Sequence, residues 1–304
     1  MPLFRLSSLF ADRENTKGLG FGLLAYGMWG CFPLFFSLFT TTPAFEILTH
    51  RIIWSCAFLL LLVTVARRWQ PVIKALASPS QLVKAAVCAL LIAFNWWLYI
   101  WAVGHHEVLQ ASLGYFMTPL VNVALGMLVL KERMNRLQSV ALLLVITGIL
   151  IQLVRLGELP WISLALAGSF GCYGLFRKQI FLDGLTGLFV ETFLLMPLAL
   201  ISFSWLHFQG ISHFAQQWST SLLLIASGIL TALPLLAFAG ATKRLTLMTV
   251  GFLMYLNPTL QLIFALVVFD EELTPVELVT FCFIWASLIL YSIASWQTVK
   301  VRTA

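Results

Sequence analysis

Three ionisable side chains lie within, or at the rim of, long apolar stretches of the sequence: Glu46, Arg51 and Glu191. A charge inside a bilayer is costly unless it is paired or hydrated, so such residues are functional candidates by default. Arg51 lies more than one helical turn into its stretch, which favours an anion-binding site or a buried ion pair over a side chain that reaches the membrane surface. Glu46 begins the same stretch, where a helix cap and a functional role are both open. Glu46 and Glu191 are the carboxylates that could take up and release a proton.

Further polar and aromatic side chains also fall inside apolar stretches. An unsatisfied amide in hydrocarbon is costly, so part of this set should bond between helices and the rest should face a cavity. Aromatic faces in such a cavity suit flat or cationic organic molecules. The predicted substrate-binding set is Arg51, Trp29, Asn95, Trp97, Tyr99, Tyr115, Asn122, Tyr255, Asn257 and Gln261. Prolines interrupt helical hydrogen bonding, and the predicted hinges are Pro33, Pro119 and Pro258.

A metal site is not expected. His105, His106 and Glu107 form a polar group between two apolar stretches, but adjacent residues do not share a helical face, and no second cluster has zinc-like spacing. A solvated turn is the favoured interpretation. The five cysteines lie in separate apolar stretches without a CxxC pair, which indicates packing roles. We expect no cofactor and no catalytic residues.

The amino-acid composition indicates whether the protein is surrounded by water or by lipid. Of 304 residues, 61% are hydrophobic and 10% are charged, against about 45–50% and about 25% in soluble domains. A water-soluble globule of this composition would expose large apolar patches, and the same numbers exclude a disordered chain. Five cysteines are too few and too scattered for a disulfide scaffold. The predicted fold class is therefore an all-α integral membrane protein.

The apolar residues divide into ten stretches of about 20 residues, the length that a helix needs to cross a bilayer. Short connectors leave no room for a soluble catalytic domain. The predicted spans are residues 18–39, 46–66, 82–103, 108–130, 137–154, 160–176, 186–205, 220–241, 247–269 and 276–296.

The positive charges sort to one set of connectors. Of the 18 Lys and Arg residues, only Arg51 and Arg155 fall elsewhere, and Arg177 and Lys178 are counted with the majority. Because positively charged flanks stay in the cytoplasm, both termini should be cytoplasmic. The net charge of +6 is thereby explained by membrane insertion, and no nucleic-acid partner is expected. The first apolar stretch is too long for a signal peptide and should be retained.

The two halves of the sequence resemble each other weakly. An offset of 139 residues superposes Pro119 on Pro258, Asn122 on Gln261 and Glu132 on Glu271, and an offset of 141 pairs GCFPLF (residues 30–35) with GCYGLF (residues 171–176). Five spans in each half would insert the two copies in opposite directions, and the basic KERMNR and acidic DEELTP connectors agree with this. The predicted units are residues 18–154 and 159–297, two inverted five-helix repeats. Such repeats support alternating access, although a duplication kept only for assembly is the alternative.

Four motifs resemble a known family: EILTHRIIWS (residues 46–55), NWWLYIWAV (95–103), ASLGYFMTPLVN (111–122) and YGLFRK (173–178). Together they resemble the RarD family of EamA-type transporters, within the drug/metabolite transporter superfamily. The resemblance implies a multi-pass protein of the bacterial inner membrane, built from two inverted five-helix halves. It also implies a link, by family name, to chloramphenicol, and a kinship with exporters of amino acids and other metabolites.

One position departs from the family pattern. The family commonly has Glu directly before ASLGY, where this chain has Gln110, so a proton-coupling role for that acid does not carry over. The residues that match the pattern are Glu46, Arg51, Tyr115, Pro119 and Asn122.

The function predicted from these observations is secondary active transport of small organic solutes, such as metabolites, amino acids or amphenicol-type drugs, outward and by alternating access. No GxxxxGK[ST] loop is present, so ATP is not the direct driving force. Proton exchange and facilitated diffusion both remain open. The expected partners are the solute and the lipid bilayer, and a homodimer is compatible with the sequence.

Two other function classes are weaker. An integral-membrane enzyme acting on lipid-linked substrates would need an acid and a base within reach of each other, and only residues 105–107 offer a cluster. A channel would need charged rings or a filter-like repeat, and the sequence has neither.

Overall fold

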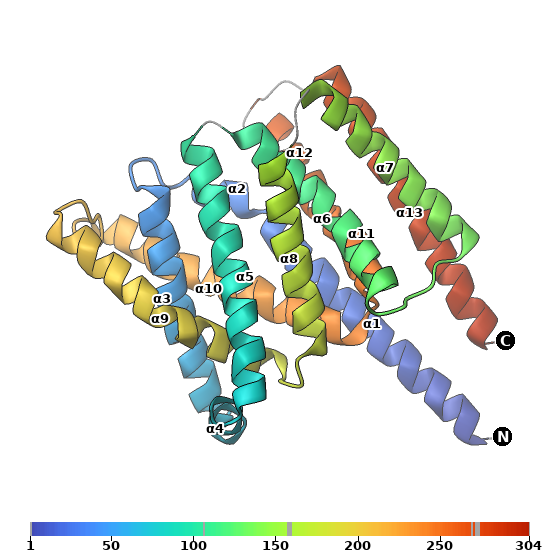
Figure 1. Ribbon diagram of the computed structural model, residues 1–304, viewed down its shortest axis with the longest axis horizontal. Helices are drawn as coiled ribbons and strands as arrows, with labels where there is room; N and C mark the ends of the chain where they lie inside the picture. Colours follow the sequence, from blue (N-terminus) through green and yellow to red (C-terminus); the bar gives the residue numbers. More distant parts are fainter. Residues whose placement is uncertain (1, 106, 157–159, 269, 271–273, 304) are drawn as a thin grey trace.

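The computed structural model describes residues 2–105, 107–156, 160–268, 270 and 274–303. Helices account for almost all of these residues, and none of them forms a strand. Figure 1 shows the helices packed side by side in one bundle, with the start of α1 and the end of α13 at the same side. The helices are α1 (Pro2–Gly30), α2 (Phe32–Phe36), α3 (Ala44–Val65), α4 (Trp69–Ala77), α5 (Pro79–Gly104), α6 (Val108–Leu128), α7 (Arg136–Leu156), α8 (Trp161–Gln179), α9 (Gly184–Phe208), α10 (Trp218–Arg244), α11 (Leu247–Met254), α12 (Leu256–Val267) and α13 (Pro275–Thr303).

Every predicted span overlaps a helix or a pair of helices, and seven segments within the described residues are long and apolar enough to cross a membrane. Two shorter apolar helices, Leu113–Leu128 and Leu278–Ala294, lie in α6 and α13. The remaining predicted span corresponds to α8, which does not reach the same hydropathy. Helix α4 was not predicted, because its nine residues are too short for a span.

Helix α8 is buried over more than half of its residues. Eleven of its 19 residues are buried, and it packs against both α5 and α6. Much of α8 faces other helices. Glycines such as Gly171 and Gly174 let those helices approach closely, which a larger apolar side chain at the same position would prevent. Asn122 of α6 and Phe238 of α10 lie next to the position that a Cβ on Gly174 would occupy.

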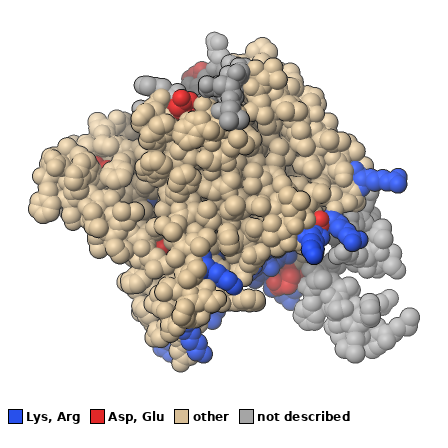
Figure 2. Space-filling model, viewed as in Figure 1, with Lys and Arg blue, Asp and Glu red and all other residues tan. Residues whose placement is uncertain are grey.

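The surface of the bundle is apolar over most of its area, as Figure 2 shows. Large side chains such as Leu61, Val154, Leu198 and Ile201 are more than half exposed. Residues of this kind would cause aggregation in water, but they match the interior of a bilayer. The Lys and Arg side chains visible in Figure 2 gather along the lower and right-hand edges of the view.

The helices pack in a definite set of pairs. Helix α3 lies between α9 and α10, α1 contacts both α10 and α12, and α5 contacts α8 and α9. Helices α6 and α11 contact each other, and α7 pairs with α13 at one side of the bundle, as Figure 1 shows.

Serine hydroxyl groups connect several of these pairs by donating to backbone carbonyls of the neighbouring helix. Ser55 of α3 donates to Gly228 O at 2.8 Å, Ser163 of α8 to Gln110 O at 2.6 Å, and Ser287 of α13 to Ala141 O at 2.7 Å. Small polar residues at helix crossings are typical of membrane bundles, because they satisfy a hydroxyl without forcing the backbones apart.

Two predicted spans are broken at the expected prolines. Cys31 separates α1 from α2, whose first turn holds Pro33, and Tyr255 separates α11 from α12, whose first turn holds Pro258. Pro119, in contrast, lies inside the continuous helix α6. All three positions remain predicted hinges.

Replacing Gly228 with alanine should destabilise the protein by about 1–3 kcal/mol, because an added methyl group would overpack the α3–α10 contact. A Cβ at Gly228 would collide with Trp54 and would lie 2.6 Å from Ser55 N. Gly168→Ala is the matched control, since no atom lies within 4 Å of its added Cβ. Thermal unfolding in detergent should give a lower midpoint for Gly228→Ala alone. Equal midpoints would contradict this close approach of α3 and α10.

Candidate functional site

Arg51 lies on α3 inside the bundle, among side chains from three other helices. Its Nε donates to Thr231 Oγ1 of α10 at 2.8 Å. Its guanidinium carbon lies 4.9 Å from the ring centroid of Trp96, 5.4 Å from Phe36 and 5.9 Å from Phe32. Cation–π contacts at these distances stabilise a cation that is withdrawn from water. No carboxylate among the described residues forms an ion pair with Arg51.

Two predicted tyrosines belong to the same group. The rings of Tyr99 and Tyr115 lie 5.7 Å apart in an edge-to-face arrangement, and both phenols are within electrostatic range of Arg51. Helix α5 supplies Tyr99 and Trp96, and α6 supplies Tyr115. The structure therefore places Tyr99 and Tyr115 near Arg51, and a substrate-binding role for the three stays a prediction.

The predicted tryptophans lie elsewhere. Trp97 is 51% exposed and its ring contacts Phe94, so its neighbour Trp96 takes the place beside Arg51. Trp29 packs into a cluster with Tyr26, Phe170 and Phe238 in the core.

The predicted amides have separate environments. Asn95 connects α5 to α8 by donating to Leu166 O and to Ser169 Oγ, each at 2.9 Å, which is an interhelical structural role. Gln261 donates to Asn257 Oδ1 at 2.8 Å within α12. Asn122 is fully buried, and neither its Oδ1 nor its Nδ2 has a hydrogen-bond partner among the described residues.

The Asn122 environment lies where α6, α8 and α11 meet. Its side chain is next to Gly171 and Gly174 of α8 and next to Gly251 of α11. Tyr255, just after α11, donates from its hydroxyl to Phe116 O of α6 at 3.1 Å. A buried amide without a partner is costly, so Asn122 is an unfavourable feature of this junction as it stands.

Glu46 holds the connection between α9 and α10. Its Oε1 accepts from Ser212 Oγ at 2.9 Å, from His213 N at 2.7 Å and from Phe214 N at 3.3 Å, and its Oε2 lies 2.8 Å from His213 Nδ1. The side chain of Glu46 is fully buried, and His213 is 30% exposed. One turn further along α3, His50 stacks on Phe214 at 4.7 Å.

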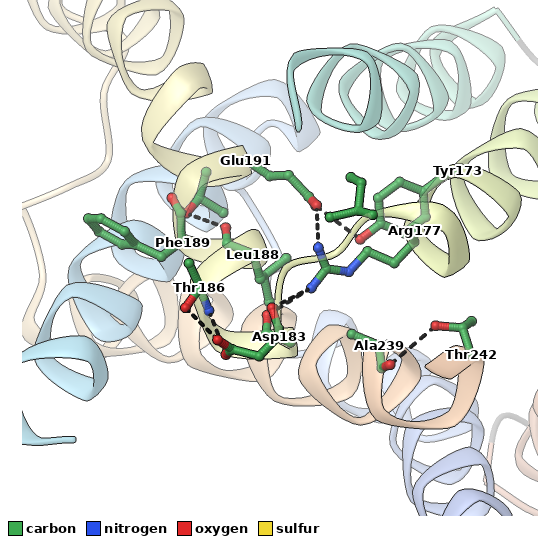
Figure 3. A network of polar contacts seen from close by, with 12 residues as sticks. Tyr173, Arg177, Asp183, Thr186, Leu188, Phe189, Glu191, Ala239 and Thr242 are labelled. Carbon is green, nitrogen blue, oxygen red and sulfur yellow. Dashed lines mark hydrogen bonds and ion pairs between the residues drawn. The ribbon is translucent and has the colours of Figure 1, made fainter. Parts of the chain in front are cut away.

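Glu191 forms a buried ion pair that the sequence analysis did not anticipate. Figure 3 shows the guanidinium of Arg177 between Glu191 and the start of α9. Arg177 Nη1 lies 2.8 Å from Glu191 Oε1, while Nη2 donates to Gly184 O at 2.9 Å and to Asp183 O at 3.3 Å. Tyr173 donates to the other Glu191 oxygen at 3.2 Å. A Cβ at Gly187 would occupy the space of the guanidinium, so glycine is required there.

The assignment of Arg177 to a solvated connector is therefore wrong. Its side chain is completely buried in the last turns of α8, whereas Lys178 reaches the carbonyls of Thr242 and Leu245 at the end of α10. A sequence signal for the Arg177–Glu191 pair is weak, because the partners lie on different helices.

Asp183 begins α9 beside this pair, outside the span. Its Oδ1 accepts from Thr186 N at 3.1 Å and its Oδ2 from Thr186 Oγ1 at 2.7 Å, as Figure 3 shows. Burial alone would raise the pKa of Asp183, but the hydrogen bonds from Thr186 outweigh it and hold the pKa below its usual value. Because this pKa is lowered on folding, the stabilisation is present at neutral pH and is lost as the pH falls through the lowered value.

Glu132 was named only as a repeat marker, and it has a clear role. It lies in the connector between α6 and α7, and its carboxylate accepts from Leu247 N at 2.8 Å and from Met248 N at 3.0 Å. It thus caps the first turn of α11, where backbone N–H groups have no helical acceptor. Its predicted counterpart Glu271 lies outside the described residues.

The polar group at residues 105–107 does not assemble a metal site among the residues described. His106 lies outside them, His105 stacks on Trp101, and Glu107 accepts from Gln110 Nε2 at 3.2 Å. No group of three His, Cys, Asp or Glu side chains in the described part of the chain could hold a metal ion.

Comparisons with known proteins give a consistent picture. The model of the EamA-like transporter family matches residues 16–154. Protein RarD of Escherichia coli (strain K12) is 44% identical over 280 residues, which cover 92% of this chain and 95% of that protein. An uncharacterized transporter of Vibrio cholerae is 43% identical over 283 residues, covering 93% of this chain and 94% of that protein.

Two more distant proteins agree. Chloramphenicol-sensitive protein RarD of Pseudomonas aeruginosa is 28% identical over 296 residues, covering 95% of this chain and 97% of that protein. A solved structure, described only as the crystal structure of a protein, superposes with a TM-score of 0.69 at 16% identity, covering 92% of this chain and 98% of the other. The latter likeness concerns the fold alone.

Glu191→Leu should destabilise the protein by roughly 3–5 kcal/mol, because it leaves the Arg177 charge buried without its partner. The double variant Arg177→Met with Glu191→Leu should recover part of this loss, since it removes both charges. Thermal unfolding in detergent measures both. Glu14→Gln, which breaks the exposed contacts to Lys17 and Arg244, is the control and should change little. A double variant less stable than Glu191→Leu would contradict this account.

Proposed function

Because the chain belongs to the RarD family of EamA-like transporters, we propose that it moves a small organic solute across the bacterial inner membrane by alternating access. The observation that carries the proposal is the group around Arg51, a cation held inside an apolar bundle without an ionic partner among the described residues. Intramembrane cations of this kind mark substrate pathways.

The proposed architecture is ten spans in two inverted repeats, residues 18–154 and 159–297. In this scheme α1 with α2 corresponds to α8, α3 to α9, α5 to α10, α6 to α11 with α12, and α7 to α13. If each helix is replaced by its counterpart in the other half, every contact should map onto another contact. The α6–α8 pair maps onto α1–α12, the α3–α10 pair onto α5–α9, and the α1–α10 pair onto α5–α8. All six pairs are in contact. Helices α3 and α9, α6 and α11, and α7 and α13 contact their own counterparts, as we expect for elements beside a two-fold axis.

One hydrogen bond supports the same register. Tyr255 donates to Phe116 O, and the two residues are 139 positions apart, the offset that superposes Pro119 on Pro258. A contact between equivalent positions is expected only at the axis that relates the two copies.

Alternating access requires the two halves to move against each other. The junction around Asn122 suits such motion, because glycines of α8 and α11 meet α6 there and the amide has no fixed partner in the described residues. We propose that the second conformation satisfies this amide and that Pro33, Pro119 and Pro258 absorb the change in helix direction. Both termini are proposed to be cytoplasmic, in agreement with the positive edges in Figure 2.

The outward direction and the solute classes rest on the family. One relative is named for chloramphenicol sensitivity, so amphenicols, amino acids and small metabolites are the compounds to test first. Of the two candidate coupling groups we favour Glu46, because its partner His213 is partly exposed, whereas Glu191 is paired with a fully buried arginine.

Transport is tested with purified protein in proteoliposomes. A thermal-shift screen against amphenicols, amino acids and metabolites should identify compounds that raise the unfolding temperature, since a ligand of the folded state stabilises it by mass action. Those compounds should then exchange across proteoliposomes faster than across protein-free vesicles. No stabilising compound in any class, together with fluxes equal to those of empty vesicles, would overturn the proposed function.

Replacing Glu46 with glutamine should keep exchange of the transported compound at equal pH but remove its acceleration by a pH gradient. Glu107→Gln is the control, because Glu107 is also a carboxylate near a helix start, and its side chain accepts a local hydrogen bond from Gln110 one turn along. Flux measured with and without an ionophore that collapses the gradient gives the comparison. Acceleration that persists in Glu46→Gln would assign Glu46 to anchoring the α9–α10 connection alone.

A further inference from the structure

Arg51 differs from the other cations inside the bundle in what it contacts. Lys and Arg side chains near the ends of α8 and α10 all have protein acceptors, either a carboxylate or backbone carbonyls; these are Arg177, Lys178, Lys243 and Arg244. Arg51 has a single hydrogen-bond acceptor among the described residues, the hydroxyl of Thr231. The guanidinium is therefore held by a neutral hydroxyl, and no carboxylate of the described residues neutralises its positive charge.

The hydrogen bond to Thr231 uses only the Nε–H donor of Arg51 and leaves its Nη donors without a protein acceptor among the described residues. Thr231 accepts from Arg51 Nε and donates its own proton to Ser227 O at 2.7 Å, so the hydroxyl is oriented from both sides. With Nε occupied, the two Nη groups remain for a ligand, and together they offer two parallel N–H donors. This fork matches the two oxygens of a carboxylate. Arg51 is partly buried, so its side chain is not completely enclosed by the protein.

The surroundings of the guanidinium restrict the ligand further. Phe32, Phe36 and Trp96 lie around it, and the ring pair of Tyr99 and Tyr115 is close by. Aromatic walls favour an apolar or planar ligand body and reduce the access of water, which strengthens a charge-assisted hydrogen bond. No second cation contacts this group in the part of the chain that the structure describes. Arg51 alone would therefore neutralise a ligand with one negative charge, but not a ligand with two.

We propose that Arg51 binds the carboxylate of a small organic monoanion or zwitterion, with Thr231 orienting the guanidinium and the aromatic rings enclosing the rest of the molecule. This proposal rests on the proposed transport function, for which it specifies the substrate class. A divalent phosphate is disfavoured because a single cation would leave it with an unbalanced charge in an apolar setting.

The test compares carboxylates with their neutral amides. Purified protein is titrated, in buffer of constant chloride concentration, with phenylacetate and phenylacetamide, with L-phenylalanine and L-phenylalaninamide, and with inorganic phosphate. Binding is followed by thermal shift and by quenching of tryptophan fluorescence, since Trp96 lies beside the cation. We expect at least one carboxylate to bind and its amide to bind roughly a hundredfold more weakly.

Variants connect binding to Arg51. Arg51→Gln should abolish carboxylate binding. Thr231→Val leaves the Arg51 charge in place but removes the hydroxyl that orients the guanidinium, so it should weaken binding about tenfold. Lys84→Gln is the matched control, because Lys84 makes a cation–π contact with Phe181 away from this group and should leave binding unchanged. If Arg51→Gln does not fold, Thr231→Val still provides the comparison.

The outcomes separate this proposal from the transport proposal. Equal binding of acid and amide, binding only of phosphate, or carboxylate binding unaffected by both Arg51→Gln and Thr231→Val would overturn the assignment of the carboxylate site. If other compounds still exchange across proteoliposomes in that case, the transport function stands without it. Absence of any flux would instead overturn the proposed function.

Discussion

The structure depends on one constraint: lipid cannot accept or donate hydrogen bonds, so polar groups inside the bundle must be satisfied by other parts of the chain. The backbone meets this requirement by remaining helical. Polar side chains meet it at helix crossings, where Ser55, Ser163 and Ser287 donate to carbonyls of neighbouring helices and Asn95 bridges α5 to α8. These contacts define which helices are neighbours, because hydrophobic burial alone does not distinguish protein from lipid.

Buried charges follow the same constraint and reveal two kinds of site. Arg177 is surrounded by acceptors from Glu191 and the start of α9, which suits a fixed structural joint. Arg51 has aromatic rings and one hydroxyl instead. The difference lies in the donors: both Arg51 Nη groups lack a protein acceptor among the described residues, whereas the Nη groups of Arg177 have acceptors.

A buried amide without a hydrogen-bond partner among the described residues lies at the junction of α6, α8 and α11. Asn122 lacks a partner among the described residues, and glycines on two of these helices allow close approach. Side chains of α6 fill the space beside these glycines, as Val121 does at Gly171. The Glu132 carboxylate fixes the start of α11 nearby, so it connects the α6–α7 connector to α11.

The sequence by itself indicated a lipid solvent and the approximate position of every long apolar helix, because crossing a bilayer requires long apolar runs. It also marked prolines as points where helices could break; helices do break near Pro33 and Pro258, but α6 continues through Pro119. The sequence included Arg51, Tyr99 and Tyr115 in a larger set of ten candidates for substrate binding. It did not distinguish Trp96 from Trp97, pair Arg177 with Glu191, or find that Glu46 holds a connection 166 residues away. In a soluble helix, the polar face would have indicated these orientations. A membrane helix is apolar toward lipid and toward protein alike, so the direction of each side chain was decided only when the helices packed together.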